Sequence, residues 1–296
     1  MNTNILTKDK DPMGAAILDY QTSGKAGKLR VLSSMFEEDE MPVKHLFRSF
    51  EEMPKLEQKA LMLAKGKVLD VGAGAGCHAL ALQEGIDYNQ SSTQTDTTCR
   101  IISVKAIDIS PLSCEAMRLR GVKDAECINL FDEHLSSGKS SANHSDTTEE
   151  GSAFDTILLL MNGTGIAGKI ANLPALFHRL KALLNPGGQI LIDSSDLKYI
   201  YENEDGSFDI NLAGAYYGEV DYQMVYDGLK NPMIHNGQKK KDENGKIQKA
   251  VAVKGEPFDW LYVDFPLLKS IAESCGLHCE LVAEGEHYDY LARICQ

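Results

Sequence analysis

Residues 68–78 read VLDVGAGAGCH, and this stretch decides the fold. A short apolar run ends at Asp70, and three glycines then follow at every second position. The run from Lys67 to Val71 predicts a buried strand, and residues 79–83 predict the helix that follows it. A turn built from glycines lets the backbone approach a ligand closely, because no Cβ stands in the way. The free N–H groups at the start of the helix favour a polar or anionic group there.

The spacing of the glycines separates two classes of nucleotide-like cofactor. The dinucleotide fingerprint G-x-G-x-x-G would need a glycine at the position of Cys77. Here the third glycine is Gly76, and Asp70 precedes the first glycine by two residues. A plain strand-to-helix turn uses similar residues, but the strand, acid, glycines and helix together favour a cofactor site. NAD is the least favoured cofactor.

The chain from residue 67 onward alternates predicted strands and helices, which is typical of a parallel sheet with crossover helices. The expected strands are 67–71, 101–107, 125–129, 154–161 and 189–193, with an antiparallel pair at 280–284 and 288–294. The expected helices in this part are 111–120 and 173–184. Residues 1–64 are predicted to form an N-terminal cap with helices at 13–20, 42–50 and 54–63 and a strand at 29–32.

An aromatic-rich insertion at about residues 197–262 interrupts the alternation. Residues 220–226 and 247–253 predict an antiparallel hairpin around the basic turn Lys239–Lys241. An insertion after the fifth strand would lie near the carboxyl ends of the sheet, where ligands of open α/β folds bind. Its aromatic side chains either line a substrate site or pack a small satellite core, and both interpretations stay open.

Composition and charge weigh against several classes of protein. The chain of 296 residues carries a net charge of −13, whereas nucleic-acid binding relies on basic patches. No apolar run approaches the roughly 18–20 residues of a membrane span, and residues 1–10 lack the apolar core of a signal peptide. We therefore expect a cytoplasmic monomer or homodimer with no nucleic-acid or membrane partner. The seven cysteines lack paired C-x-x-C units, which favours reduced thiols and no metal site.

Residues 67–196 resemble a class I S-adenosylmethionine (SAM)-dependent methyltransferase. The sequence D-x-G-x-G-x-G matches motif I, and Asp108 matches the acid that binds both ribose hydroxyls, since a carboxylate accepts two hydrogen bonds. Residues 129–132 match the segment that contacts the adenine edge. The resemblance implies SAM as cofactor, bound by residues at four strand ends: Asp70, Gly72, Ala73, Gly74, Gly76, His78, Asp108, Ile109, Asn129, Leu130, Phe131, Met161 and Asn162.

The fold that this resemblance implies is α/β. It is a Rossmann-like seven-stranded mixed sheet with helices on both faces, formed by residues 65–296, with the N-terminal helical cap and an inserted antiparallel hairpin. Residues 162–165, Asn-Gly-Thr-Gly, stand where methyltransferases of amides and bases often carry N/D-P-P-Y/F, so that substrate class is not supported. With residues 193–196 and 258–261, this segment is similar to a group of poorly characterised bacterial methyltransferase-like proteins.

A small-molecule acceptor is the expected substrate. Methyl transfer from a sulfonium is an in-line displacement, which needs the nucleophile and the methyl carbon held together in a water-poor site. Asn162 is a candidate to bind the amino or carboxylate end of SAM, or the acceptor. Asp193 and Asp196 are candidates to bind a cationic substrate or to act as a base, or else they cap a turn or helix. In the cap, His45 and Arg48 either reach a substrate carboxylate or phosphate or serve in packing.

Two alternative functions use the same fold. A SAM-binding or S-adenosylhomocysteine (SAH)-binding protein without transferase activity would share the cofactor site and lack an acceptor. An aminopropyltransferase would use an acid-rich polyamine site, for which Asp193 and Asp196 are the only indication.

Overall fold

The central sheet has seven strands in the order β13-β14-β7-β6-β3-β4-β5. The computed structural model describes residues 4–86, 101–135, 154–210, 214–229 and 252–296, with the short strands β9 (Ile234–His235) and β10 (Gln238–Lys239). The strands of the central sheet are β3 (Gly66–Val71), β4 (Ile101–Asp108), β5 (Ala125–Cys127), β6 (Phe154–Leu159), β7 (Leu184–Ser195), β13 (His278–Glu284) and β14 (Asp289–Cys295). The five strands from β3 to β7 pair in parallel, and β14 pairs antiparallel with β7 and β13. The predicted mixed sheet is confirmed.

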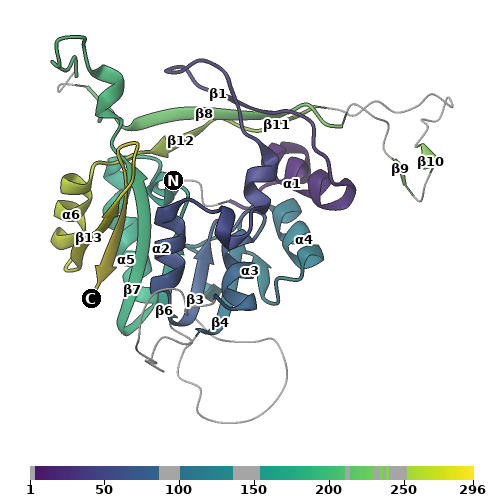
Figure 1. Ribbon diagram of the computed structural model, residues 1–296, viewed down its shortest axis with the longest axis horizontal. Helices are drawn as coiled ribbons and strands as arrows, with labels where there is room; N and C mark the ends of the chain where they lie inside the picture. The colour runs from purple at the N-terminus through teal and green to yellow at the C-terminus, as the bar shows by residue number, and fades with distance from the viewer. Residues whose placement is uncertain are drawn as a thin grey trace.

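Helices cover both faces of this sheet (Figure 1). They are α2 (Lys55–Leu63), α3 (Cys77–Glu84), α4 (Pro111–Arg120), α5 (Leu173–Leu183) and α6 (Phe265–Ser274). Successive strand residues point to opposite faces. Val68 of β3 is buried with residues of α2, α3 and α4, whereas its neighbour Leu69 is buried with residues of α5 and α6. Both faces of β3 are therefore buried, which explains its continuous apolar run.

Two of the strand ends that differ from the prediction lie beside residues with a positive φ. β6 ends at Leu159 rather than at residue 161, because Met161 and Asn162 take left-handed backbone conformations that a strand does not allow. β7 begins at Leu184 and so includes the predicted turn 185–188, where Gly187 has a φ of 76°. Positive φ therefore ends β6, whereas β7 continues through Gly187.

The N-terminal cap contains η1 (Lys8–Lys10), α1 (Pro12–Ser23), β1 (Leu29–Leu32), β2 (Asp39–Glu40), η2 (Val43–Phe47), η3 (Phe50–Glu52) and α2. The single helix predicted at residues 42–50 is wrong. Two 3-10 turns form instead, separated by extended backbone at Arg48 and Ser49. The extended backbone lets Arg48 turn inward, where its guanidinium pairs with the buried Glu57 of α2.

A second sheet joins the cap to the insertion. β8 (Glu219–Tyr226) pairs antiparallel with β1 of the cap, with β11 (Val253–Lys254) and with β12 (Phe258–Leu261). Of the predicted hairpin partner, residues 247–251 lie outside the described residues, and Val253 pairs with Tyr226. Figure 1 shows β8 crossing above the carboxyl ends of the parallel strands. The insertion thus covers the edge at which ligands bind in this class of fold.

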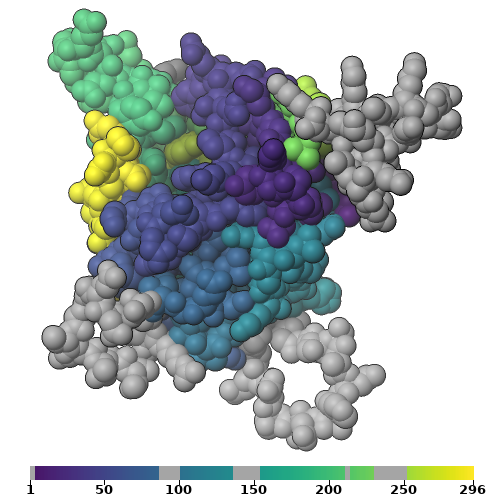
Figure 2. Space-filling model, turned by 45° about the vertical axis from the view of Figure 1, so that its right-hand side comes forward, coloured from purple at the N-terminus to yellow at the C-terminus, as the bar shows by residue number. Residues whose placement is uncertain are grey.

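The cap packs directly onto the central domain (Figure 2). Ile17 of α1, Leu29 of β1 and Tyr226 of β8 share a buried cluster with Ala75 of the glycine turn and Ala116 of α4. The cap, the insertion and the glycine turn therefore share one apolar cluster. No helix in the described part of the chain is both long enough and apolar enough to span a membrane.

Substitution of Gly76 by alanine is expected to destabilise the protein by about 1–3 kcal/mol more than substitution of Gly121. Both glycines have positive φ, so both variants carry a backbone cost of roughly 1–2 kcal/mol. A Cβ on Gly76 would lie 2.9 Å from Val122 and 3.0 Å from Met117, whereas a Cβ on Gly121 would meet no atom within 4 Å. Urea unfolding of the two variants measures the difference, and equal midpoints would contradict the packing role of Gly76.

Candidate active site

The glycine turn between β3 and α3 uses its three glycines for two different purposes. Gly72, Gly74 and Gly76 all have positive φ, which explains why glycine is required at each. Gly72 is exposed and Gly74 half-buried, and a Cβ on Gly74 would meet no atom within 4 Å. Gly76 is buried against α4. Gly72 and Gly74 therefore present open backbone to a ligand, whereas Gly76 allows α3 to pack closely.

Asp108 lies beside this turn at the end of β4. Its carboxylate accepts hydrogen bonds from the backbone N–H groups of Gly74 and Ser110, both at 2.8 Å. Burial raises the pKa of Asp108 to about 6. The predicted ribose acid is thus held against the glycine turn, with further lone pairs on the same two oxygens.

The segment after β5 divides into buried and accessible residues. The side-chain oxygen of Asn129 accepts the backbone N–H of Phe131 at 2.8 Å, and Leu130 is part of the central core. Arg179 of α5 donates to the carbonyl of Leu130 at 2.7 Å, which holds the segment in place. Phe131, and Ile109 at the end of β4, are half-buried, so both apolar residues keep some exposure.

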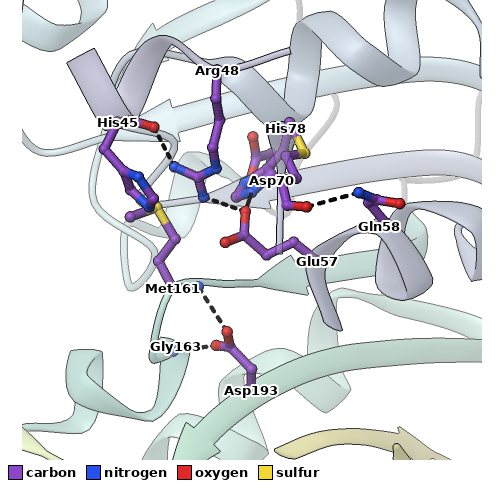
Figure 3. A network of polar contacts seen from close by, with 10 residues as sticks. His45, Arg48, Glu57, Gln58, Asp70, His78, Met161, Gly163 and Asp193 are labelled. Carbon is purple, nitrogen blue, oxygen red and sulfur yellow. Dashed lines mark hydrogen bonds and ion pairs between the residues drawn. The ribbon is translucent and has the colours of Figure 1, made fainter. Parts of the chain in front are cut away.

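A cluster of buried charges lies beneath the glycine turn (Figure 3). Glu57 of α2 pairs through one oxygen with Arg48 and with Nε2 of His78, the latter at 2.6 Å. Nδ1 of His78 lies 4.0 Å from Asp70. Burial alone would lower the pKa of His78, but its neighbours Cys77 and Glu57 raise that pKa by more, so the net shift is upward. The cluster links the cap to β3 and α3.

Sequence reasoning missed Glu57, although the sequence held a signal. Glu57 lies next to Leu56, three residues before Ala60 and four before Leu61, on the side of α2 that faces the core. A carboxylate on an apolar helix face needs a cationic partner, because an unpaired buried charge is costly. Arg48, considered in the sequence as a possible substrate contact, supplies that partner together with His78.

The predicted cofactor residues therefore form two layers. Residues with some exposure, which a ligand can reach from solvent, are Gly72, Gly74, Asp108, Ile109, Phe131, Met161 and Asn162. Residues buried beneath them are Asp70, Ala73, Gly76, His78, Asn129 and Leu130. Asp70 is 1% exposed and His78 3% exposed. Their side chains support the turn from below, and burial raises the pKa of Asp70.

The end of β6 holds a strained loop. Met161 has a φ of 66° and Asn162 a φ of 62°, which is costly for residues other than glycine. Asp193 of β7 accepts the backbone N–H groups of Met161 and Gly163, each at 3.0 Å. Burial raises the pKa of Asp193 to about 6. Asp193, a candidate catalytic residue from the sequence, thus holds the loop in its strained conformation.

The Asn-Gly-Thr-Gly segment attaches the insertion to the central sheet. The Asn162 amide donates to the carbonyl of Leu261 in β12 at 3.2 Å and accepts the Ser194 hydroxyl at 3.0 Å. Thr164, which is fully buried, also bonds to the carbonyl of Leu261 at 2.9 Å. A Cβ on Gly165 would lie 1.9 Å from the indole of Trp260. Contacts with β12 therefore explain Asn162, Thr164 and Gly165, whereas a Cβ on Gly163 would lie 2.5 Å from Leu159.

Asp196 is engaged by a different part of the insertion. Its carboxylate caps η9 (Leu197–Tyr201) by accepting the N–H of Lys198 at 2.9 Å, and it accepts the Tyr217 hydroxyl at 2.8 Å. Asp193 and Asp196 therefore bond to separate protein segments, and the acid pair that pointed to a polyamine site has structural partners. Within the described residues, no group of three His, Cys, Asp or Glu side chains is placed to hold a metal ion.

Comparison with solved structures identifies the family. The chain is similar to a SAM-dependent methyltransferase from Bacteroides fragilis, whose crystal structure is a complex with S-adenosyl-L-homocysteine. Identity is 47% over 99% of this chain and 98% of that chain, with a TM-score of 0.74. The chain belongs to the SAM-dependent methyltransferases. The predicted family and SAM as its methyl donor are thereby confirmed.

More distant similarity extends to the fold. The CcbJ methyltransferase from Streptomyces caelestis is 13% identical, with 98% of this chain and 99% of that chain covered and a TM-score of 0.51. At this identity the likeness shows the fold alone. No family model matches the chain, and no curated protein matches it.

Replacement of Asp193 by alanine is expected to destabilise the methyltransferase by about 2–4 kcal/mol, because two backbone N–H groups of the strained loop lose their acceptor. Replacement of Asp196 by alanine should cost about 1 kcal/mol, the typical value of a lost N-cap. Urea unfolding at pH 7.5 provides the measurement. A smaller loss for the Asp193 variant than for the Asp196 variant would contradict the loop-holding role.

Proposed function

We propose that this protein transfers the methyl group of SAM to a small-molecule acceptor by in-line displacement. The observation that carries the proposal is the contact between Asp108 and the backbone of Gly74. It brings a carboxylate for the ribose and an open glycine turn for the methionine part of SAM to the same edge of the sheet. The 47% identity to a methyltransferase crystallised with SAH supports the same placement.

SAM would lie across three strand ends in this proposal. The ribose binds Asp108, and the adenine lies by the half-buried side chains of Ile109 and Phe131. The methionine part lies over Gly72 and Gly74, which leaves the methyl group on the side of β6. The strand order β6-β3-β4-β5 supports this direction, since adenine and methyl group then lie on opposite sides of the glycine turn.

The three candidate catalytic residues take positioning roles in this arrangement. Asp193 holds the loop that borders the methyl group, through its bonds to Met161 and Gly163. Asn162 fixes the same loop to β12, and the residue keeps some exposure on the side proposed for the cofactor. Asp196 orders the start of η9 on the acceptor side. In-line transfer depends on this kind of fixed geometry, and it needs no covalent bond between the enzyme and the methyl group.

A small acceptor fits the covering of the site. The sheet formed by β1, β8 and β12 crosses the carboxyl edge of the central strands (Figure 1), which restricts access by a macromolecule. The net charge of −13 also disfavours a nucleic-acid substrate, since phosphates would be repelled.

Two measurements together test this function. Calorimetry with SAH should show one binding site per chain, and SAM carrying a labelled methyl group should pass the label to a component of a bacterial metabolite extract below about 1 kDa. Lack of SAH binding by folded protein would contradict the cofactor site. SAH binding without transfer to any component would instead support the non-catalytic SAM-binding alternative.

The affinity for SAH is expected to depend on the ionisation of Asp108. Its pKa of about 6 means that the carboxylate, which accepts both ribose hydroxyls, forms as the pH rises through 6. Binding should therefore be about tenfold weaker at pH 5 than at pH 7.5. Calorimetry across this range gives the profile.

The Asp108→Asn variant is the matched control for this profile. It cannot ionise, so it should bind SAH weakly and with little change between pH 5 and pH 7.5. If the variant kept the pH dependence of the unmodified protein, the pH dependence would have to come from another group, such as Asp193.

A further inference from the structure

The 3-10 turn η2 lies over the part of the site where the methyl group is placed. Its buried residues Val43 and Leu46 share a cluster with Ala75 of the glycine turn, and Met161 at the end of β6 packs against the same cluster. β3 and β6 are neighbours in the sheet, so η2 packs with residues that follow both of these strands. The cap segment therefore covers the methyl end of SAM in the arrangement proposed above.

His45 is the histidine of this turn. Its carbonyl accepts a hydrogen bond from Arg48, which fixes the backbone, while its side chain is exposed. Among the described residues, none makes a hydrogen bond to the imidazole ring of His45. Figure 3 shows the ring directed toward the side chain of Met161. A ring with free nitrogen atoms thus lies at the border of the proposed transfer site.

Other titratable groups near this border already have partners. The oxygens of Asp193 accept backbone N–H groups, and the ring of His78 is buried against Glu57. Asp196 caps η9. The imidazole of His45 is exposed and makes no hydrogen bond to a described residue. Asp193, His78 and Asp196 each have a hydrogen-bond partner.

We propose that His45 accepts the proton that the acceptor loses during methyl transfer, an inference that rests on the proposed function. The acceptor is then a neutral amine or hydroxyl compound. Its lone pair forms the bond to the methyl carbon, and the carbon–sulfur bond breaks with its electrons left on sulfur. The proton of the nucleophile passes to a ring nitrogen of His45 and afterwards to water.

The surroundings of His45 suit a proton acceptor. Although His45 is exposed, neighbouring atoms partly desolvate its ring and lower its pKa, the nearby guanidinium of Arg48 lowers it further, and the carboxylate of Glu57 opposes this shift. Arg48 follows η2 directly and Glu57 lies on α2, and these are the charged groups that act on the ring. The net downward shift keeps the imidazole neutral at pH 7, as a base requires.

Nuclear magnetic resonance tests the placement without knowledge of the acceptor. Histidine-labelled protein is titrated with pH in complex with SAH and in complex with sinefungin, a SAM analogue with an amine-bearing carbon in place of the methylsulfonium. The amine is charged, so it should lower the pKa of a nearby His45 by at least about 0.5 unit relative to the SAH complex. His278, at the start of β13, is the internal control and should not shift.

Kinetics tests the chemical role once the transfer assay has identified an acceptor fraction. His45→Gln should lower kcat by about 100-fold or more, the usual contribution of a general base, while the KM for SAM changes less than threefold. The rate of the unmodified enzyme should rise with pH through the pKa of His45, and this step should be absent in the variant. His278→Gln should behave like the unmodified enzyme.

The outcomes separate this proposal from the proposed function. SAH binding with identical His45 pKa values in both complexes would overturn the role of His45 and leave the methyltransferase function intact. A His45→Gln variant with unchanged kcat and unchanged pH profile would also overturn it. Failure to bind SAH would instead contradict the proposed function itself.

Discussion

One buried carboxylate, that of Glu57, joins the cap to the cofactor-binding part of the domain. The same oxygen bonds to Arg48 from the cap and to His78 from the helix that follows the glycine turn. Desolvating these charges is costly, and removal of one partner would leave the others buried and uncompensated. These ion pairs therefore fix the cap, including η2, relative to the glycine turn. The proposed site depends on this fixed position.

A second constraint acts on the loop that follows β6. The loop at the end of β6 keeps two residues other than glycine in left-handed conformations. Such strain persists only where the surroundings over-determine the backbone, and here Asp193 holds the loop from β7 while Leu261 holds it from β12. The loop is thus fixed between the central sheet and the insertion. Preorganisation of this kind is what an in-line transfer requires of a protein.

Local patterns predicted much of this molecule. Pro111–Arg120 and Leu29–Leu32 have the predicted bounds, because caps and apolar runs of one segment determine them. The split of the predicted helix at 42–50 and the early end of β6 were not predicted. A buried ion pair with α2 and the hydrogen bond that Met161 donates to Asp193 of β7 decide them. The pairing of β1 with β8 was also missed, because it joins residues nearly 200 positions apart.

The sequence by itself determined the class of cofactor. Asp70 and the glycines that follow it belong to one strand-to-turn unit, and Asp108 belongs to the next. Such units can be recognised from the order of residues along the chain. Tertiary structure alone decided which of these residues a ligand can reach and which support the turn from below. It also decided that Asp193 holds a loop and that His45 borders the proposed transfer site. The physical reason is that burial and hydrogen-bond partners arise from segments far apart in the chain, whose contacts no local pattern contains.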